Sequence, residues 1–379
     1  MAPPPRVAID LRPLALPHVT GVGLLVQQIL EELPGHGFEF VGLSNRPIPE
    51  GRIPPGTPVR VEAGPGGRIS WETRTLPGLL RSLTPAPDLH HATWNHGVPR
   101  GLPFPSVLSL LDLIPWVRPE FVPWPRPAPL HRWLYRRTAR RSASAARAIV
   151  TLSEASRRDI AARMRGLEDR IEVVPCAVPR WFRQPDDARV GRWRARYGGG
   201  AYWLYLGGFD PRKGLDVLAD AAGLLADAGS PPRPLVLAGA INPTAERVRR
   251  SLELRGVLAH FPGYVPDEEL APLIAGASLF LYPSRYEGFG IPPVLAMAAG
   301  VPCVVSDGGA LPEVVGDAAV VVRAGDPRSL AEGIREALSR SPELSERGPR
   351  RAARFTVEGL AARMTRVYER ALPPRRESA

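Results

Sequence analysis

Short apolar runs alternate along the chain with longer segments whose apolar residues have helical spacing. The run from Arg6 to Asp10 (RVAID) predicts an opening strand, HVTGVG (18–23) predicts a glycine loop, and LLVQQILEEL after it predicts a helix. The same order returns at 202–225, where an apolar run, a glycine turn and an amphipathic segment follow one another. Alternating strands and helices favour parallel sheets. We therefore expect an α/β fold with two Rossmann-like halves whose parallel sheets face each other across a cleft.

The pattern also suggests where the halves divide. The segment IEVVPCAVPRWFRQPDD begins as a strand and then becomes rich in proline and charge, which is typical of a crossing between domains. A last helix is expected over 357–371. The predicted domains are residues 1–178, residues 179–356, and a C-terminal helix with its tail at 357–379.

One stretch of the second half combines features of an anion site. The apolar run 279–282 predicts a buried strand, Glu287 and a glycine-containing loop at 288–290 follow, and Pro292 suits the first turn of a helix. A glycine loop that leads into a helix start places backbone N–H groups and a positive dipole end at one point, which favours a diphosphate. Glu287 could accept hydrogen bonds from sugar hydroxyls. A tight strand-to-helix turn without a ligand is the alternative.

Charge narrows the choice of partners. The length of 379 residues suggests two or three domains. The chain carries a net charge of +11, and Lys213 is the single lysine among its 49 basic residues. Either position 213 requires a compact ammonium group, or this lysine was retained by chance. The positive charge fits nucleic acid, an anionic membrane or phosphorylated substrates. We expect no nucleic acid, because neither a known module nor interleaved aromatic residues accompany the charge.

The segment 126–147 is strongly basic and has no acidic residue. Arg132, Arg136 and Arg140 fall on one helical face. They form either a patch for an anionic membrane or lipid-diphosphate acceptor, or an ordinary solvated helix in an arginine-rich protein. No apolar run reaches the roughly 18 residues that span a bilayer, and the start lacks a signal peptide's hydrophobic region. We expect a cytoplasmic protein. The basic helix adds the hypothesis that the protein associates peripherally with the inner face of the membrane.

Neither cysteine has metal-ligand spacing. Cys176 and Cys303 stand in unrelated segments, so we expect reduced core thiols. The chain also lacks a carboxylate pair or a His/Cys cluster in its motifs. We expect no metal and no cofactor.

The segment EGFGIPPVLAMAAGVPCVVSDGGALPEVVGDAAVVV (287–322) resembles, almost residue for residue, the donor-site signature of the family 4 retaining glycosyltransferases, the group 1 enzymes with the GT-B fold. The resemblance implies a nucleotide-diphosphate sugar as co-substrate and a metal-independent transfer with retention, in which the donor phosphate takes the acceptor proton. It also implies that the first domain binds the acceptor, that the second binds the donor, and that the C-terminal helix packs back on the first.

The resemblance assigns roles residue by residue. Lys213 and Arg212 would stabilise the departing diphosphate, and Glu287 would orient the donor sugar. The positions implied to bind the donor are Gly21, Gly23, Gly207, Gly208, Tyr264, Val265, Gly288, Phe289, Gly290, Ile291 and Leu295. On the acceptor side we single out His91, Trp94, His96 and Asp112; for the first three, buried packing is the alternative.

Three positions depart from the family's pattern. Leu111, Gly208 and Leu295 stand where relatives carry histidine, arginine and glutamate. Since that glutamate binds both ribose hydroxyls, Leu295 suggests a deoxyribose donor such as a dTDP-sugar, with a GDP-sugar as another candidate. The acceptor could be a glycan, a lipid-linked sugar or a small molecule. The second hypothesis is a non-catalytic GT-B protein that binds a partner transferase, or a sugar nucleotide without turnover.

Overall fold

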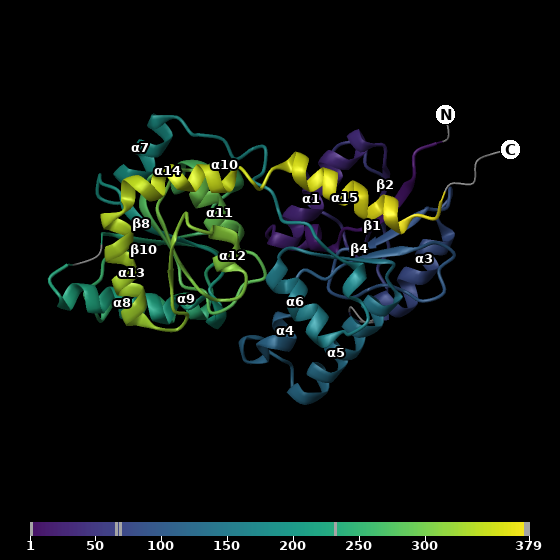
Figure 1. Ribbon diagram of the computed structural model, residues 1–379, viewed down its shortest axis with the longest axis horizontal. Coiled ribbons are helices and arrows are strands. Elements are labelled where there is room, and N and C mark those ends of the chain that lie inside the picture. Colours follow the sequence, from purple (N-terminus) through teal and green to yellow (C-terminus); the bar gives the residue numbers. More distant parts are fainter. Residues whose placement is uncertain (1–2, 65–66, 68–69, 231–232, 375–379) are drawn as a thin grey trace. The chain divides into compact units, whose positions relative to one another are not determined.

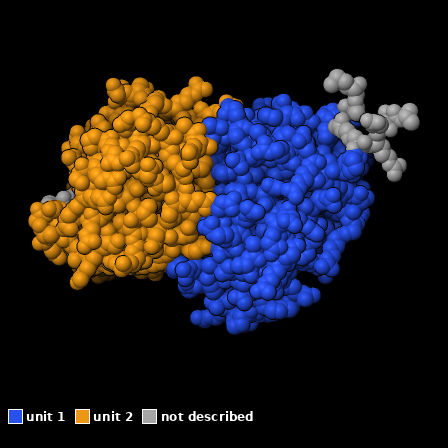
Figure 2. Space-filling model, viewed as in Figure 1, with its two compact units in different colours: residues 1–177, 356–379 blue, residues 178–355 orange. Residues whose placement is uncertain are grey.

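The computed structural model describes residues 3–64, 67, 70–230 and 233–374, so the last five residues of the predicted tail lie outside it. The chain forms two compact units, which Figure 2 shows in two colours. The first unit comprises 1–177 together with 356–379, and the second comprises 178–355. The chain thus leaves the first unit after its last strand and returns to it with its final helix.

The first unit is built on a seven-stranded sheet with the order β3-β2-β1-β4-β5-β6-β7. Every recorded pair of neighbouring strands is parallel, which confirms the expected α/β class. The strand order reverses between β1 and β4, which makes their carboxyl ends a topological switch point. The strands are β1 (Arg6–Asp10), β2 (Glu39–Ser44), β3 (Val59–Val61), β4 (Leu89–Ala92), β5 (Ser106–Ser109), β6 (Ala148–Thr151) and β7 (Ile171–Val173).

Helices cover both faces of this sheet (Figure 1). On one face, α3, α5 and α6 contribute apolar side chains to two core clusters under the strands. Helices α1 and α15 contact each other, and α15 also contacts β5 and β6. The helices are α1 (Gly21–Glu32), α3 (Leu76–Ser82), α4 (Ile114–Val117), α5 (Ala128–Ala145), α6 (Glu154–Arg163) and α15 (Val357–Ala371). Short 3-10 or π turns are η1 (Arg12–Ala15), η2 (Leu33–His36), η3 (Trp71–Thr75), η4 (Pro119–Phe121) and η5 (Glu168–Arg170).

The second unit repeats the plan with a six-stranded parallel sheet of order β10-β9-β8-β11-β12-β13. Its switch point lies between β8 and β11. The strands are β8 (Tyr202–Leu206), β9 (Leu235–Ala238), β10 (Ala259–Gly263), β11 (Ala277–Tyr282), β12 (Cys303–Ser306) and β13 (Val320–Val322). The helices are α7 (Asp187–Arg196), η6 (Pro211–Lys213), α8 (Leu215–Asp227), α9 (Pro243–Glu253), α10 (Asp267–Ala275), α11 (Ile291–Ala298), α12 (Leu311–Val315), α13 (Pro327–Ser339) and α14 (Ser341–Ala352).

Local signals in the sequence explain several of these boundaries. Asp326 caps α13 by accepting hydrogen bonds from the N–H groups of Arg328 and Ser329. Ser153 caps α6 in the same way through the N–H of Ser156. Such caps satisfy backbone donors that the first helical turn leaves unpaired. The predicted strand at 279–282 is the end of β11.

One buried hydrogen bond fastens α15 to the first sheet. The Tyr368 hydroxyl and His91 Nδ1 lie 2.8 Å apart, and His91 Nε2 lies 2.9 Å from Ser109 Oγ. Both His91 and Tyr368 are fully buried. Burial lowers the pKa of His91 to about 3, so the ring is neutral and has one donor and one acceptor to satisfy.

We expect Tyr368→Phe to destabilise the protein by about 1 to 3 kcal/mol, because a buried imidazole nitrogen loses its partner. Urea unfolding at pH 7 measures the change. Tyr264→Phe is the matched control, since Tyr264 is 42% exposed and its loss of a hydroxyl should change stability by less than about 0.5 kcal/mol. Equal stability of the two variants would show that the Tyr368 hydroxyl does not fasten the helix.

Candidate active site

Two loops meet at the switch point of the second sheet. The first follows β8 and carries η6 with Arg212 and Lys213, and the second follows β11 and leads through Glu287 to α11. Because β8 and β11 are parallel neighbours, their following loops lie at the same edge. Gly214 has φ +66°, and a Cβ atom there would lie 2.2 Å from the carbonyl oxygen of Pro283. Glycine at 214 therefore allows the two loops to pack against each other.

The carboxylate of Glu287 is the centre of a buried polar cluster between these loops. Lys213 Nζ lies 2.7 Å from Glu287 Oε1, and Arg212 Nη1 lies 2.6 Å from Glu287 Oε2. Ser284 Oγ and the Tyr282 hydroxyl donate hydrogen bonds to Oε1 at 2.6 and 3.1 Å. Lys213 Nζ also donates to the Tyr282 hydroxyl at 2.8 Å. All three catalytic candidates of the sequence thus lie together.

Electrostatics keep this carboxylate ionised. Burial on its own would raise the pKa of Glu287, but the charges of Lys213 and Arg212, with hydrogen bonds from Lys213 and Ser284, lower it to about 2. Burial likewise opposes the charge of Arg212, yet Glu287 and Asp210 raise the pKa of the guanidinium above its ordinary value. At neutral pH two cations therefore share one fully buried carboxylate. Arg212 Nε also lies 3.6 Å from Oδ1 of the more exposed Asp210, so the positive groups beside the start of α11 are held by two carboxylates.

The backbone of Glu287 is anchored by residues 306–310, which belong to the 287–322 segment but had no role of their own assigned from the sequence. Ala310 N donates to the Glu287 carbonyl at 2.9 Å, and Glu287 N donates to the Gly308 carbonyl at 3.3 Å. A Cβ atom at Gly309 would lie 2.3 Å from the Glu287 carbonyl oxygen. The glycines of SDGGA (306–310) therefore allow a close approach that fixes the loop. The local signal for this contact in the sequence is a glycine pair just after a buried strand.

The glycine loop at 288–290 has the expected relation to its helix. Gly290 occupies the position before α11 with φ +112°, and Ile291 is the first helical residue. Phe289 is buried and packs edge-on against Phe355. Gly288 follows Glu287 directly, so the loop connects the ionic cluster to the N-terminus of α11. The glycine loop therefore leads directly from Glu287 into the helix start, and its role as an anion site stays a prediction.

The structure also places the other residues that were predicted on the donor side. Leu295 is buried within α11. The carbonyl of Gly208 accepts a hydrogen bond of 2.6 Å from the Tyr205 hydroxyl, and Gly207 has φ +154°. Tyr264 and Val265 line a cavity of about 410 Å³ with Trp193, Arg196 and neighbouring residues.

Gly21 and Gly23 differ from the expected glycine loop. Helix α1 begins at Gly21, so both glycines belong to its first turn. Thr20 caps this helix, and its Oγ1 accepts a hydrogen bond of 3.3 Å from Gly23 N. A threonine that can cap extends the helix toward the strand, and the expectation of a longer loop overlooked this signal. The amide of Gly23 is thus already engaged.

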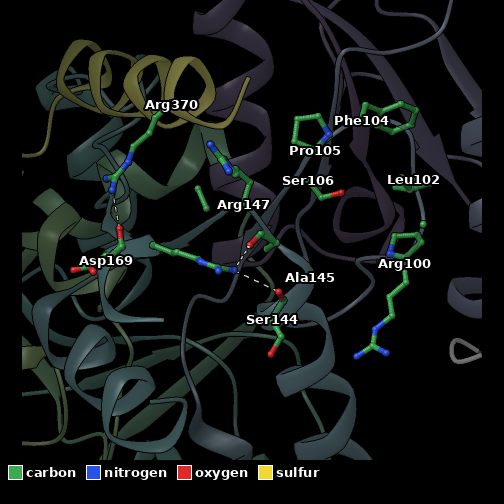
Figure 3. A pocket seen from close by; sticks show the side chains of 15 residues that line it. Arg100, Leu102, Phe104, Pro105, Ser106, Ser144, Ala145, Arg147, Asp169 and Arg370 are labelled. Atoms are coloured by element: carbon green, nitrogen blue, oxygen red, sulfur yellow. Dashed lines mark hydrogen bonds between the residues drawn. The ribbon is translucent and has the colours of Figure 1, made fainter. Parts of the chain in front are cut away.

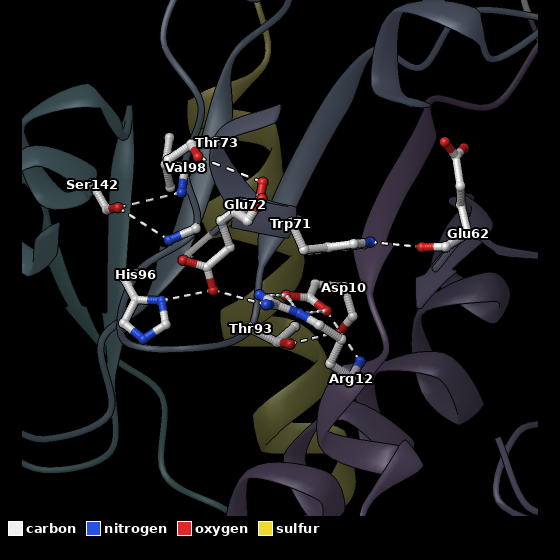
Figure 4. Close-up of polar contacts among 12 residues, drawn as sticks. Asp10, Arg12, Glu62, Trp71, Glu72, Thr73, Thr93, His96, Val98 and Ser142 are labelled. Atoms are coloured by element: carbon white, nitrogen blue, oxygen red, sulfur yellow. Dashed lines mark hydrogen bonds and ion pairs between the residues drawn. The ribbon is translucent and has the colours of Figure 1, made fainter. Parts of the chain in front are cut away.

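On the first unit, the switch point between β1 and β4 holds a second buried ionic network (Figure 4). Arg12 Nε donates to Asp10 Oδ1 at 2.9 Å, and Arg12 Nη1 lies 2.7 Å from Glu72 Oε1. The same Glu72 oxygen lies 2.9 Å from His96 Nδ1. Trp71 packs under the Arg12 guanidinium at 4.5 Å. Burial would raise the pKa of Glu72, but His96 and Arg12 lower it below its usual value.

This network was not predicted, apart from His96. Asp10 ends β1 and Arg12 begins η1, Glu72 and Trp71 belong to η3, and His96 follows β4. These segments are far apart in the sequence, and none of the other network residues stands in a recognisable motif. For His96 the sequence left two interpretations open, contact with the acceptor and buried packing. In the structure, His96 is buried at one end of the ionic network. Its acceptor role stays a prediction.

The other acceptor-side candidates are distributed around β4 and β5. His91 lies within β4, fully buried between Tyr368 and Ser109, so its geometry is that of packing rather than ligand contact. Trp94 is half-buried in the loop after β4. Asp112 follows β5, and its Oδ1 accepts from Ile114 N at 3.0 Å. Leu111 is buried beside it.

Comparison with known proteins now fixes the family. Residues 194–354 match the family model described as glycosyl transferases group 1, and residues 20–177 match the glycosyl transferase 4-like domain. The O-antigen chain mannosyltransferase B of Escherichia coli is 32% identical over 272 residues, covering 70% of each chain. This chain belongs to the group 1 glycosyltransferases. The resemblance that the segment 287–322 carries is thereby confirmed.

Two further proteins are similar to this glycosyltransferase. The MMP alpha-(1->4)-mannosyltransferase of Mycolicibacterium hassiacum is 34% identical over 232 residues, which cover 59% of this chain and 54% of the relative. The structure of a sucrose-phosphate synthase from Thermosynechococcus elongatus superimposes with a TM-score of 0.76 at 20% identity, covering 96% of this chain and 98% of that one. At that identity the structural likeness concerns the fold, which is that of the GT-B glycosyltransferases.

In the part of this glycosyltransferase that the structure describes, no helix combines the length and apolar character needed to cross a membrane. Within the same residues, no three His, Cys, Asp or Glu side chains are grouped so that they could hold a metal ion. Cys176 and Cys303 are unpaired and buried, and burial raises the pKa of the Cys176 thiol to about 12.

The lowered pKa of Glu287 predicts a pH dependence of stability. Its folded pKa of about 2 lies below the ordinary 4.5, so the stabilisation is complete above pH 4.5 and is lost as the pH falls toward 2. The full loss is on the order of 3 kcal/mol for one group. We expect Glu287→Gln to remove this part of the acid dependence and to be less stable at pH 7, because it leaves Lys213 and Arg212 buried without a carboxylate.

Urea unfolding between pH 7 and 3.5 measures both effects. The difference in stability between the wild type and Glu287→Gln should shrink as the pH falls. Glu253→Gln, at an exposed glutamate of the same unit, is the control and should follow the wild type at every pH. A difference between wild type and Glu287→Gln that stays constant with pH would contradict the ionised, buried Glu287.

Proposed function

We propose that this glycosyltransferase moves a mannosyl-type sugar from a nucleotide-diphosphate donor to a glycan, lipid-linked or small-molecule acceptor, with retention and without a metal. The observation that carries the proposal is a pair of cations at the switch point of the second sheet, the buried Lys213 and the half-buried Arg212. The names of the two relatives, both mannosyltransferases, support the choice of sugar.

The two cations suit a departing nucleoside diphosphate. Negative charge develops on the diphosphate as the bond to the sugar C1 breaks, and fixed positive groups stabilise that charge. Lys213 supplies a point charge and Arg212 a guanidinium fork, and both are already held by Glu287. The start of α11 at Gly290 adds backbone N–H groups and the positive end of its dipole. Together they provide the positive charge that a metal ion supplies in other transferases.

Glu287 has two roles in this proposal. It accepts hydrogen bonds from Lys213, Ser284 and Tyr282, which holds the cations in place before the donor arrives. Its place at the start of the glycine loop also suits it to orient hydroxyls of the donor sugar. Holding the cations preorganises the site, so little rearrangement is needed when the diphosphate binds.

Retention follows from attack on the face from which the diphosphate leaves. The bond between C1 and the phosphate oxygen breaks, the acceptor oxygen bonds to C1 on the same face, and the acceptor proton passes to the departing phosphate oxygen. This route requires no protein general base. It accommodates Leu111, where relatives have a histidine.

Leu295 bears on the choice of nucleotide. The side chain is buried in α11 and cannot accept a hydrogen bond from a ribose hydroxyl. An unpartnered hydroxyl in a desolvated site costs about 1 to 3 kcal/mol. We therefore propose a dTDP-sugar as the first donor to test and a GDP-sugar as the second.

The donor proposal predicts tight binding that depends on Lys213. A calorimetric panel of UDP-, GDP-, ADP- and dTDP-sugars should identify one preferred donor, and Lys213→Ala should weaken its binding at least about tenfold through loss of a charge-assisted contact. Arg233→Ala removes one exposed cation from the same unit and is the matched control, expected to bind like the wild type.

The same panel separates the alternatives. Hydrolysis of the bound donor without acceptor would support an enzyme, whereas donor binding without hydrolysis or transfer would support the non-catalytic GT-B protein. If Lys213→Ala binds as well as Arg233→Ala, the assignment of the donor site to the Lys213 cluster is wrong.

We further propose that helix α5 associates with anionic membranes. Leu130 and Trp133 are 49% and 54% exposed on this basic helix. The Arg137 guanidinium lies 5.4 Å from the Trp133 ring, and Arg140 lies 4.8 Å from the ring of Trp116. Exposed apolar and aromatic residues among arginines suit the interface of a membrane that carries negative lipids.

Vesicle binding tests this proposal. Vesicles that contain phosphatidylglycerol should co-sediment with the protein in a salt-sensitive manner, and Trp133→Ala should weaken the association. Trp181→Ala, at a tryptophan of the second unit that is 39% exposed, should have no effect. Absence of co-sedimentation with anionic vesicles at low salt would leave α5 as an ordinary solvated helix.

A further inference from the structure

The first unit has a pocket of about 650 Å³ at the amino ends of its strands. Ser106 begins β5, Ala148 begins β6, and Arg170 directly precedes β7, and all three line this pocket. The strands are parallel, so this edge is opposite the one at which β1 and β4 lead into the network of Arg12 and His96. The pocket is thus separate from the acceptor side of the same unit.

Arginines dominate the charge of this pocket. The lining contains four arginines and a single acidic residue, Asp169. In Figure 3, Arg370 and Asp169 lie on one side of the pocket, and Arg100 lies on the other with Leu102 and Phe104. Such a concentration of positive charge in a concave site attracts anions.

Two of the arginines are held in place by the fold. Arg170 Nη1 donates to the carbonyl oxygens of Ala146 at 3.2 Å and Ser144 at 3.4 Å, at the C-terminal end of α5. Arg370 Nη2 donates to the Asp169 carbonyl at 2.8 Å, and its Nη1 pairs with Glu172. These contacts fix two guanidinium groups at the rim. A preorganised group loses less conformational entropy when a ligand binds.

The other two arginines have no acidic partner. Arg100 and Arg147 are exposed, and neither forms an ion pair with any residue that the structure describes. Elsewhere on this arginine-rich surface, guanidinium groups do pair with carboxylates, as Arg340 does with Glu336 and Glu343. The charges of Arg100 and Arg147 are not offset by an ion pair, so an anion bound in the pocket would be attracted to both.

The wall of the pocket on the side of Arg100 is partly apolar. Leu102 and Phe104 line it and pack against the core cluster under β1 and β2, so they are backed by fixed structure. A cavity of this volume, with apolar side chains next to one arginine and across from Arg370, suits a small molecule that has an apolar or planar body and a phosphate end. Arginine recognises phosphate through paired hydrogen bonds.

We propose that this pocket binds an organic phosphate, with its phosphate or diphosphate group on Arg100, Arg147 and the held arginines and its body against Leu102 and Phe104. The body comes from one of two sources, a nucleotide or a lipid-linked phosphate. Pyrophosphate, GDP and farnesyl diphosphate share the diphosphate and differ in this body, so they separate the sources.

Calorimetric titration of the full chain with these three probes tests the proposal. The double variant Arg100→Ala/Arg147→Ala should bind the preferred probe at least about tenfold more weakly than wild type, because two charge-assisted contacts are lost. The control Arg60→Ala/Arg74→Ala removes the same charge from two exposed arginines of the same unit outside the pocket and should bind like wild type. Thermal unfolding verifies that both variants are folded, and Arg100→Gln/Arg147→Gln replaces the alanine variant if it is not.

Binding at the donor site is distinguished by Lys213→Ala. Each titration is repeated in this background, where the pocket's contribution should persist and remain sensitive to Arg100 and Arg147. Tighter binding of GDP than of pyrophosphate identifies the nucleotide, and tighter binding of farnesyl diphosphate identifies the lipid phosphate. If neither binds more tightly than pyrophosphate, or if both double variants lose affinity equally, the proposal is overturned.

Discussion

The pairing of two cations with one buried carboxylate, Glu287, is the constraint on which the second unit's site depends. Lys213 and Arg212 both lie against Glu287, and a buried cation without a partner is costly. The surrounding structure is arranged to keep this carboxylate ionised and fixed. Ser284 and Tyr282 donate to it, and Gly309 allows the backbone of the 306–310 segment to approach its carbonyl. A diphosphate ligand meets a site whose positive groups are already positioned.

The topology explains why such clusters form where they do. In both sheets the strand order reverses once, and the loops that follow the two strands at the reversal lie at the same edge of the sheet. The second sheet places Lys213 and Glu287 there, and the first places Arg12 and His96 there. Both units therefore present buried ionic chemistry at the same kind of position. The arginine-lined pocket lies at the opposite edge of the first sheet, where strand geometry alone creates no such crevice.

The surroundings of Lys213 explain why this position is a lysine in a chain whose other basic residues are arginines. Lys213 Nζ approaches both the Tyr282 hydroxyl and Glu287 Oε1, in a space where the side chain is nearly buried. A single nitrogen with three donors can serve both acceptors, whereas a planar guanidinium requires a wider, flatter site. Arg212 occupies the more exposed side of the same carboxylate. The two cations are thus not interchangeable here.

The sequence by itself determined the secondary structure and the family. Apolar runs such as 279–282 and caps such as Asp326 and Ser153 act over a few neighbouring residues, so they are legible without the fold. The segment 287–322 indicated the glycosyltransferase family. Only the tertiary structure decided which side chains complete each site. Glu287 contacts Lys213 although 74 positions separate them in the sequence, and Glu72 contacts Arg12 although 60 positions separate them. Strand pairing and helix packing, rather than local sequence, bring these residues together.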